Sequence, residues 1–369
     1  MICSKRKVHL FRVLRQERWY SIDVYADRLV NGLQRISPSD YSVEAVCPSD
    51  WHLPGWCGGS LYLNRGLRYS LYARRHQGDI NHVLDNSYGH LVHFLDARRT
   101  IVTSHGGTPV SWRRWNREGP AMWFFDWAFS GMLKAAHIIV VSEYSKRELL
   151  TDYVYDPQRI HVIHHGVDEH FVPLQDETVE KVRLRYKLPD ETGIILHVGH
   201  CAARKNIETL LTAFAHLLHV TNRPYRLLQV GGTFTAQQQA LIEQLGIANR
   251  VTQIPYMPNE NLVAFYNAAI AFVFPSLYEG FGIPLIEAMA CGIPIVCTDW
   301  ELFHEVCGDA AIYADTRDAE ALANALIRVL GSVELRADLR RRGLMRAREF
   351  SWQRCAQATL AVYQQMIGQ

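Results

Sequence analysis

The stretch PSLYEGFGIPLIEAMACGIP, residues 275–294, follows the short apolar run AIAFVF at 269–274. The apolar run predicts a buried strand. Gly280 and Gly282 indicate a turn, and Pro284 suits the first position of a helix, because its missing N–H would be unpaired there anyway. The stretch therefore predicts a strand, a glycine-containing turn and a helix. The unpaired N–H groups at the positive amino end of that helix predict a site for phosphate.

Two carboxylates flank this predicted anion site. Glu279 lies in the turn, and Glu287 lies about one turn inside the helix. A carboxylate accepts hydrogen bonds from neighbouring hydroxyls, such as those of a ribose or a pyranose. Taken alone, Glu287 is better explained as a solvated helix acid favoured by the dipole. With Glu279, the glycines and Pro284 at this spacing, we interpret the pair as part of a sugar-nucleotide site.

The same residues carry a family resemblance. The spacing of Glu279 and Glu287 resembles the E-x7-E signature of retaining glycosyltransferases of family 4, of the bacterial polysaccharide and lipopolysaccharide type. The resemblance covers nearly the whole chain and is strongest between residues 138 and 352. It implies the GT-B fold, an α/β architecture of two doubly wound, Rossmann-like domains facing each other across a cleft.

The resemblance also implies domain boundaries. We expect an acceptor-binding domain over residues 1–172, a nucleotide-sugar-binding domain over 173–350, and a last helix over 351–369 that crosses back to the first domain. Strands and helices alternate in both halves, which independently favours two doubly wound domains. A chain of 369 residues with 48% hydrophobic residues is long enough for both.

The net charge and the cysteine content of the chain disfavour some classes of function and some cellular compartments. The formal net charge is +2, so no strong polyelectrolyte partner is implied and a nucleic-acid binder is disfavoured. The eight cysteines are scattered without a C-x-x-C pair, which favours a reduced compartment. The polar, basic N-terminus has no signal core, and no run approaches the ~20 apolar residues of a membrane span. We expect a cytoplasmic protein, and the resemblance adds the inner face of the cytoplasmic membrane.

A second loop is predicted to hold the donor's phosphates. The segment VGHCAARKN, residues 198–206, follows an apolar strand and resembles the V-G-x4-R-K-N loop of the family. The resemblance implies that Arg204 and Lys205 neutralise the diphosphate, Arg204 by paired donation and Lys205 as a point charge, with Gly199 opening the loop. Two adjacent basic residues are usually solvated, but the strand–loop–helix context favours the phosphate role.

The remaining donor-binding predictions also come from the resemblance. Glu279 would hold the sugar hydroxyls and Glu287 the ribose. The predicted helix end contributes Phe281, Gly282, Ile283 and Pro284. Tyr256 and Met257, after a predicted strand at 251–254, would lie against the nucleobase, and hydrophobic packing is the open alternative.

One histidine in the first half is a candidate catalytic residue. His105 ends the predicted strand at 100–103 and precedes Gly106 and Gly107. The family often has a His-Asp pair here, and this chain has Gly106 in place of the Asp. The resemblance implies that His105 contacts the donor sugar or its leaving group, whereas a lone histidine is more often structural. Its place at the carboxyl end of a strand favours the functional interpretation.

Three further segments keep two interpretations each. The loop 15–21 has no glycine where the family is glycine-rich, so either Arg15, Arg18 or Tyr20 replaces the backbone contacts or the loop is plain surface. The arginine-rich helix predicted at 61–76 either lies on an anionic membrane or is solvated. The stretch WRRWNR, residues 112–117, either lines an acceptor or lipid-headgroup site or is a surface loop.

No metal or cofactor is expected. His161, His164 and His165 lie on a strand and its turn with no carboxylate or cysteine partner nearby in sequence. The chain also contains no Asp-x-Asp, the common diphosphate–metal motif.

The predicted reaction is hexose transfer from a nucleoside diphosphate to an acceptor hydroxyl, with retention by front-face displacement. The expected donor is GDP-mannose or a related sugar, and UDP-glucose is second. The expected acceptor is a glycan or a lipid-linked saccharide, with peripheral membrane contact. The alternatives are a GT-B sugar phosphorylase, a nucleotide-sugar epimerase, and a nonenzymatic sugar-nucleotide-binding module. A dinucleotide oxidoreductase is disfavoured because no G-x-G-x-x-G follows the first strand.

Overall fold

The computed structural model describes residues 5–17, 19–36, 39–49, 62–115, 119–175, 179–181, 184, 193–221, 223–256 and 259–368. The chain forms two compact units: unit 1 comprises Met1–Gly166 with Ser351–Gln369, and unit 2 comprises Val167–Phe350. The sequence-based boundary between residues 172 and 173 lies a few residues beyond this division.

Unit 1 is built on a six-stranded sheet with the order β2-β1-β3-β4-β5-β6. Every neighbouring pair of its strands is parallel. The strands are β1 (Arg6–Phe11), β2 (Tyr41–Val46), β3 (Ile80–Val83), β4 (Thr100–Ser104), β5 (His137–Val140) and β6 (Ile160–Val162). The helical elements are η1 (Arg15–Glu17), α1 (Tyr20–Ile36), η2 (Asn64–Arg68), α3 (Tyr69–Arg75), η3 (Asn86–His93), η4 (Ala97–Arg99), α4 (Pro109–Trp112), α5 (Pro120–Met132), α6 (Glu143–Asp152), η5 (Pro157–Arg159) and α15 (Trp352–Gly368).

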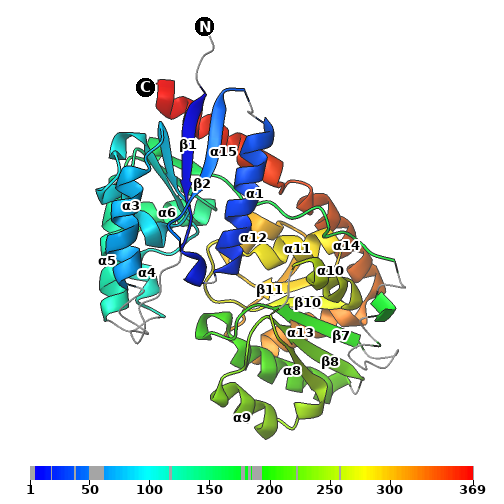
Figure 1. Ribbon diagram of the computed structural model, residues 1–369. Helices are drawn as coiled ribbons and strands as arrows, with labels where there is room; N and C mark the ends of the chain where they lie inside the picture. The colour runs from blue at the N-terminus through cyan, green and yellow to red at the C-terminus, as the bar shows by residue number, and fades with distance from the viewer. Residues whose placement is uncertain are drawn as a thin grey trace. The chain divides into compact units, whose positions relative to one another are not determined.

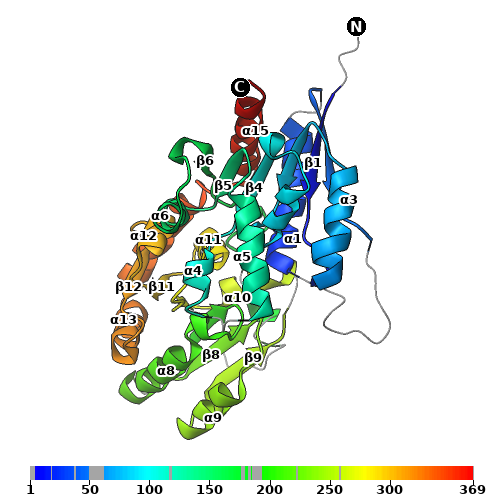
Figure 2. The same ribbon diagram turned by 90° about the vertical axis from the view of Figure 1, so that its left-hand side faces the viewer.

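Helices cover both faces of this sheet (Figures 1 and 2). Alternate strand residues separate into two buried clusters, one packed with α1 and α15 and the other with α3, α5 and α6. Because both faces are covered, the central strands β3, β4 and β5 are buried along their whole length.

The C-terminal helix α15 lies against α1 in unit 1 (Figure 1). The two helices approach closely at Gly32, where an added Cβ would lie 2.7 Å from the Cβ of Ala356. Beneath them, the buried His82 joins the two parts of the chain, with Nδ1 2.7 Å from Tyr363 Oη and Nε2 2.7 Å from Thr103 Oγ1. The last helix is therefore a structural part of unit 1.

Unit 2 contains a second six-stranded parallel sheet, with the order β12-β11-β10-β7-β8-β9. The strands are β7 (Gly193–Val198), β8 (Tyr225–Val230), β9 (Val251–Ile254), β10 (Ala271–Phe274), β11 (Ile295–Thr298) and β12 (Ala311–Ala314). The helical elements are η6 (Ala203–Lys205), α8 (Ile207–Thr221), α9 (Ala236–Gln244), η7 (Ala248–Arg250), α10 (Asn259–Ala268), α11 (Ile283–Cys291), α12 (Glu301–Cys307), α13 (Ala319–Gly331) and α14 (Val333–Ala347). The strand order reverses between β7 and β10, which is where doubly wound sheets bind ligands.

Several predicted boundaries differ from the structure. The apolar run at residues 8–14 predicts a first strand that extends to residue 14, but β1 ends at Phe11, because its pairing with β2 ends with the pair Phe11 and Val46. The helix predicted at 61–76 contains a wider π-helical turn at 64–68 and is α-helical on either side of it, at 62–63 and 69–75. Strand β12 was not predicted, since four residues at a sheet edge are too short to show a period. The helix predicted near 177–186 lies mostly outside the described residues.

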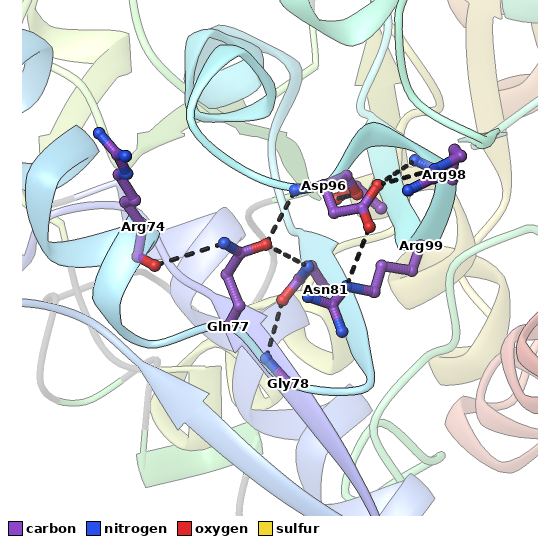
Figure 3. Close-up of polar contacts among 8 residues, drawn as sticks. Arg74, Gln77, Gly78, Asn81, Asp96, Arg98 and Arg99 are labelled. Atoms are coloured by element: carbon purple, nitrogen blue, oxygen red, sulfur yellow. Dashed lines mark hydrogen bonds and ion pairs between the residues drawn. The ribbon is translucent and has the colours of Figure 1, made fainter.

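A polar cluster joins the segments that precede β3 and β4 (Figure 3). Gln77 Oε1 accepts hydrogen bonds from Asp96 N at 2.8 Å and from Asn81 Nδ2 at 3.5 Å. Asn81 Oδ1 in turn accepts from Gly78 N at 3.0 Å. The cluster lies at the amino ends of the strands, opposite to the loops that carry His105, and its role is to hold the two strands in place.

Candidate active site

Two loops meet at the switch point of the unit 2 sheet. Residues 199–206 follow β7, and residues 275–282 follow the neighbouring parallel strand β10. Because the two strands are adjacent and parallel, their loops leave the same edge of the sheet. A backbone hydrogen bond of 2.8 Å from Leu277 N to Arg204 O ties them together. The structure thus brings the two segments singled out in the sequence into one site.

Hydroxyl and amide side chains hold the second loop from below. Thr298 Oγ1 donates to Ser276 O at 2.8 Å, and Thr316 Oγ1 donates to Pro275 O at 3.3 Å. Asn206, which ends the first loop with a φ of 58°, donates from Nδ2 to Thr316 O at 2.6 Å. Asparagine tolerates this left-handed conformation better than most residues. Sequence reasoning missed these supports, because Thr298 and Thr316 are distant from the motifs in the chain.

Arg204, Lys205 and Glu279 form a charge cluster between the loops. Glu279 Oε2 lies 3.1 Å from Arg204 Nη1, and Glu279 Oε1 pairs with Lys205 Nζ. Burial raises the pKa of the Glu279 carboxyl, but the two cations outweigh burial and hold the pKa below its usual value. Burial also lowers the pKa of Lys205, and Glu279 opposes this. Two cations with one anion leave a net positive charge in a buried place, which suits a diphosphate.

The amino end of α11 adds backbone dipoles to this cluster. Gly282 is the residue before the helix and has a φ of +99°, a conformation that favours glycine. The helix begins at Ile283, so Pro284 is at its second position and not at the first as predicted. Phe281 is buried and packs on Phe350 with ring centroids 5.7 Å apart. Within the first turn, Pro284 has no N–H and Leu285 N donates to Gly282 O at 2.9 Å, so the helix end offers an anion its dipole and the N–H groups that precede Pro284.

Glu287 lies on the same helix but in a different environment. Its side chain is buried and accepts a hydrogen bond of 2.8 Å from the hydroxyl of Tyr266 on α10. Burial raises the pKa of Glu287 to about 7, even though the Tyr266 hydrogen bond opposes the shift. The sequence did not single out Tyr266, because only the packing of α10 on α11 brings it to this carboxyl. The assignment of Glu287 to a ribose stays a prediction.

The structure describes only one of the two residues that were predicted to lie against the nucleobase. Tyr256 is exposed after β9, the edge strand, which β8 separates from β7. Met257 lies outside the described residues. Gly199, with a φ of +146°, borders the charge cluster, since an added Cβ would lie 3.5 Å from Lys205 Nζ. Gly199 therefore belongs with Lys205, whereas Tyr256 is set apart along the sheet edge.

His105 belongs to unit 1, and both of its ring nitrogens have partners. Nε2 donates to Leu84 O at 2.8 Å, so Nδ1 is left as the acceptor for the Nε2–H of His165 at 3.3 Å. The two imidazoles are stacked with centroids 5.1 Å apart, and Tyr25 meets His105 edge-on at 4.6 Å. Burial lowers the pKa of His105, so the ring is neutral. The ring is thus held in one tautomer, and sugar contact stays a prediction.

The glycine-free first loop is held by a residue that was not predicted. Glu17 of η1 is buried, lies 3.4 Å from Arg65 Nη1, and accepts a hydrogen bond from the Tyr88 hydroxyl. Burial raises the pKa of Glu17, and Arg65 opposes this shift. The loop is therefore anchored through its acid, and Arg15 is exposed. Arg18 lies outside the described residues.

The first two residues of the basic aromatic stretch 112–117 contact other parts of unit 1. Trp112 packs over Gly107, where an added Cβ would lie 2.0 Å from the indole nitrogen. Arg113 pairs with Asp126 of α5 at 2.7 Å. Arg117 lies outside the described residues, so the acceptor role of this stretch stays a prediction.

Neither a metal-binding cluster nor a membrane-spanning helix is found in the part of the chain that the structure describes. In that part of the chain, no group of three or more His, Cys, Asp or Glu side chains is arranged to hold a metal ion. Among the same residues, no helix combines the length and apolar character needed to cross a bilayer.

Comparisons with known proteins agree with this geometry. Residues 22–171 match the model for Glycosyltransferase Family 4, and residues 179–345 match the model for Glycosyl transferases group 1. A sucrose-phosphate synthase from Thermosynechococcus elongatus has a TM-score of 0.79 at 21% identity, covering 99% of this chain and 100% of that one. WaaG, a glycosyltransferase involved in lipopolysaccharide biosynthesis, has a TM-score of 0.72 at 15% identity, covering 96% of this chain and 98% of that one.

Curated relatives match over a shorter range. The O-antigen chain mannosyltransferase B of Escherichia coli is 33% identical over 61% of this chain and 60% of its own length. A mannosylfructose-phosphate synthase of Agrobacterium fabrum is 33% identical over 58% of this chain and 49% of its own length. The chain thus spans about half to two thirds of these relatives.

The fold and the charge cluster together define the class of protein, which is a pair of doubly wound α/β units, as in the GT-B architecture. With both family models matched in the expected order, the chain belongs to the GT-B glycosyltransferases, with a family 4 first half and a group 1 second half. The predicted family and fold class are therefore confirmed.

Proposed function

We propose that this protein transfers a hexose from a nucleoside diphosphate sugar to a hydroxyl of a glycan or lipid-linked acceptor, in cell-surface polysaccharide synthesis. The observation that carries the proposal is the cluster of Arg204, Lys205 and Glu279 at the unit 2 switch point, in which Lys205 is buried and the other two are partly buried. A leaving diphosphate gains negative charge in the transition state, and fixed cations at that point stabilise it. The amino end of α11 adds its dipole to the same place.

The ion pairs within this cluster indicate what its side chains would do when a donor binds. Lys205 is buried, so its charge requires an anionic partner, and Glu279 supplies one. A bound diphosphate would take over that function, since it brings more negative charge to the same cations. Glu279 would then accept hydrogen bonds from the hydroxyls of the donor sugar.

The proposed reaction retains the configuration at the anomeric carbon. The bond from that carbon to the diphosphate oxygen breaks, and a bond to the acceptor oxygen forms on the same face. The acceptor proton passes to an oxygen of the departing diphosphate. The proposal requires no metal, because Arg204, Lys205 and the helix end supply the positive charge.

Mannose is the first choice for the sugar. Curated relatives that are named as mannosyltransferases include the O-antigen enzyme above and an MMP alpha-(1->4)-mannosyltransferase of Mycolicibacterium hassiacum that is 32% identical. We therefore propose GDP-mannose first and UDP-glucose second.

The test measures nucleotide release from each donor with and without a saccharide acceptor. Lys205→Met and Glu279→Gln should each lower transfer about 100-fold or more, the usual effect of removing one preorganised charge from a transition state. Arg341→Met is the matched control, because it removes an exposed ion pair with Asp338 on α14 of the same unit. Near-normal turnover in both cluster variants would remove the assignment.

The products separate the alternatives. Acceptor-dependent nucleotide release with a new glycosidic bond supports a transferase. Recovery of an epimerised sugar nucleotide would indicate an epimerase, and sugar phosphate formed from a glycan and inorganic phosphate would indicate a phosphorylase. Donor binding without turnover would indicate a binding module.

A further inference from the structure

An apolar stripe lies on the outer side of η2 and α3 in unit 1. Leu63, Leu67 and Leu71 expose 37%, 53% and 45% of their surface. Residues four apart lie one above another on a helix, so these leucines form one continuous row. Single exposed leucines need no explanation, but a contiguous exposed row marks an interaction surface.

The opposite side of the same segment is firmly held. Tyr69 and Ala73 are fully buried in the core of unit 1, and the Tyr69 hydroxyl donates to Arg12 O at 2.6 Å. Gly66 lies against α5, where an added Cβ would be 3.3 Å from the ring of Phe124. The leucine row is therefore a rigid feature with a fixed outward direction.

Aromatic residues extend the row where it approaches α5. The ring of Tyr62 lies 5.8 Å from that of Phe124, and Tyr62 is 41% exposed. Trp123, which precedes Phe124 on α5, is 71% exposed. Tyrosine and tryptophan are the side chains that gather at the boundary between water and a bilayer.

The charge of the segment has one sign. Residues 62–76, YLNRGLRYSLYARRH, contain four arginines and neither Asp nor Glu. Arg74 and Arg75 follow Leu71 by three and four positions, so they continue the leucine row, and both are exposed. Figure 3 shows the side chain of Arg74 extending away from the polar cluster to which only its backbone carbonyl is bonded.

We propose that this surface, formed by Tyr62, Leu63, Leu67, Leu71, Arg74 and Arg75 and called here the leucine–arginine face, docks on an anionic lipid bilayer. Helices that lie in the membrane interface combine an apolar row with flanking cations whose stems lie along the lipid and whose charges meet the headgroups. This proposal rests on the proposed function and deepens it, because it identifies the surface through which the protein would reach a lipid-linked acceptor.

The charge pattern favours a bilayer over a second copy of the chain. A symmetric dimer through this face would bring two arginine-bearing segments without acids against each other, and like charges repel. An anionic bilayer instead complements the arginines and accepts the leucines together.

The test is co-sedimentation of the full chain with vesicles of phosphatidylglycerol and phosphatidylethanolamine, compared with vesicles of phosphatidylcholine alone. The native protein should sediment with the anionic vesicles, and less at high salt. Leu67→Ser with Leu71→Ser should weaken binding by roughly tenfold or more through lost apolar burial. Arg74→Gln with Arg75→Gln should weaken it roughly thirtyfold and flatten the salt dependence.

The control is Val333→Ser with Met345→Ser, which removes two exposed apolar side chains from α14 in unit 2. Native protein left in the supernatant with anionic vesicles would overturn the proposal, and so would an equal loss in the control variant. Sedimentation velocity run beside it distinguishes a second copy: a native dimer that the leucine variant converts to monomers, without vesicle binding, would also overturn it.

The outcome is independent of the sugar-transfer assignment. Vesicle binding is measured without donor, and thermal stabilisation by GDP-mannose is measured without lipid for each folded variant. Unchanged donor stabilisation with lost vesicle binding supports a separate docking surface. Equal loss of donor stabilisation in the leucine and arginine variants would show that they damage unit 1 generally, and would overturn the assignment of a separate surface.

Discussion

Removing the ionisable group at position 287 should change how the stability of unit 2 depends on pH. Glu287 is buried against Tyr266, and its pKa is raised from 4.5 to about 7, chiefly by burial. Burial penalises the charged form of a carboxyl, so the folded state prefers the neutral acid. The variant Glu287→Gln keeps the shape and the acceptor oxygen but cannot ionise. It therefore isolates the contribution of this one proton.

The magnitude follows from the pKa difference. Each pKa unit corresponds to 1.36 kcal/mol, so a shift of about 2.5 units is worth about 3 kcal/mol. Between pH 4.5 and 7 the folded state holds more protons at this site than the unfolded state. The free energy of unfolding therefore falls as pH rises through this window, and the loss is complete above pH 7.

The assay compares the native protein with Glu287→Gln by equilibrium urea denaturation between about pH 5 and 8. A hydrogen-exchange pulse at one fixed pH, read on peptides covering residues 283–298, reports unit 2 alone. We expect the native protein to lose most of about 3 kcal/mol relative to the variant as pH rises. Parallel stability curves across this range would refute the reasoning, because a carboxyl with an ordinary pKa is already ionised at pH 5.

Three further predictions concern single substitutions that change a glycine or remove a buried hydroxyl. Gly282→Ala should cost about 1–3 kcal/mol, because a residue with a Cβ is strained at a φ of +99°, and an unchanged melting temperature would contradict this. Gly131→Ala should lower the melting temperature of unit 1 strongly, because the added Cβ would lie 2.2 Å from Gly89 O. A variant that melts at the same temperature as the native protein would count against the close packing of α5 on η3. Tyr363→Phe should cost about 1–3 kcal/mol by leaving His82 Nδ1 without its partner, measured by urea denaturation, whereas no loss would mean that water replaces the hydroxyl.

The local order of strands, turns and helices was largely readable from the chain. Short runs rich in apolar residues predicted most strands of both sheets, because parallel strands covered by helices on both faces are mostly apolar. Where the prediction failed, the deciding contact was distant in sequence. Strand β1 ends where its partner β2 ends, and β12 is recognised as a strand by its pairing with β11.

The candidate site shows the same division. The glycines, Pro284 and the acids near 275–294, with the basic pair at 204–205, mark two phosphate-type loops in the sequence. That Glu279 pairs with both cations follows only from the adjacency of β7 and β10, since the partners are 74 and 75 positions apart.

The alternation of strands and helices in the sequence determined the doubly wound α/β class, and local motifs with the family resemblance marked the two loops, because backbone preference and burial act between near neighbours in the chain. Tertiary structure alone decided the electrostatics: which carboxyl is ionised beside cations, as Glu279 is, and which has its pKa raised by burial, as Glu287 has. The physical reason is that the charge state of a group depends on its depth and on the charges around it, and both are properties of the packed molecule.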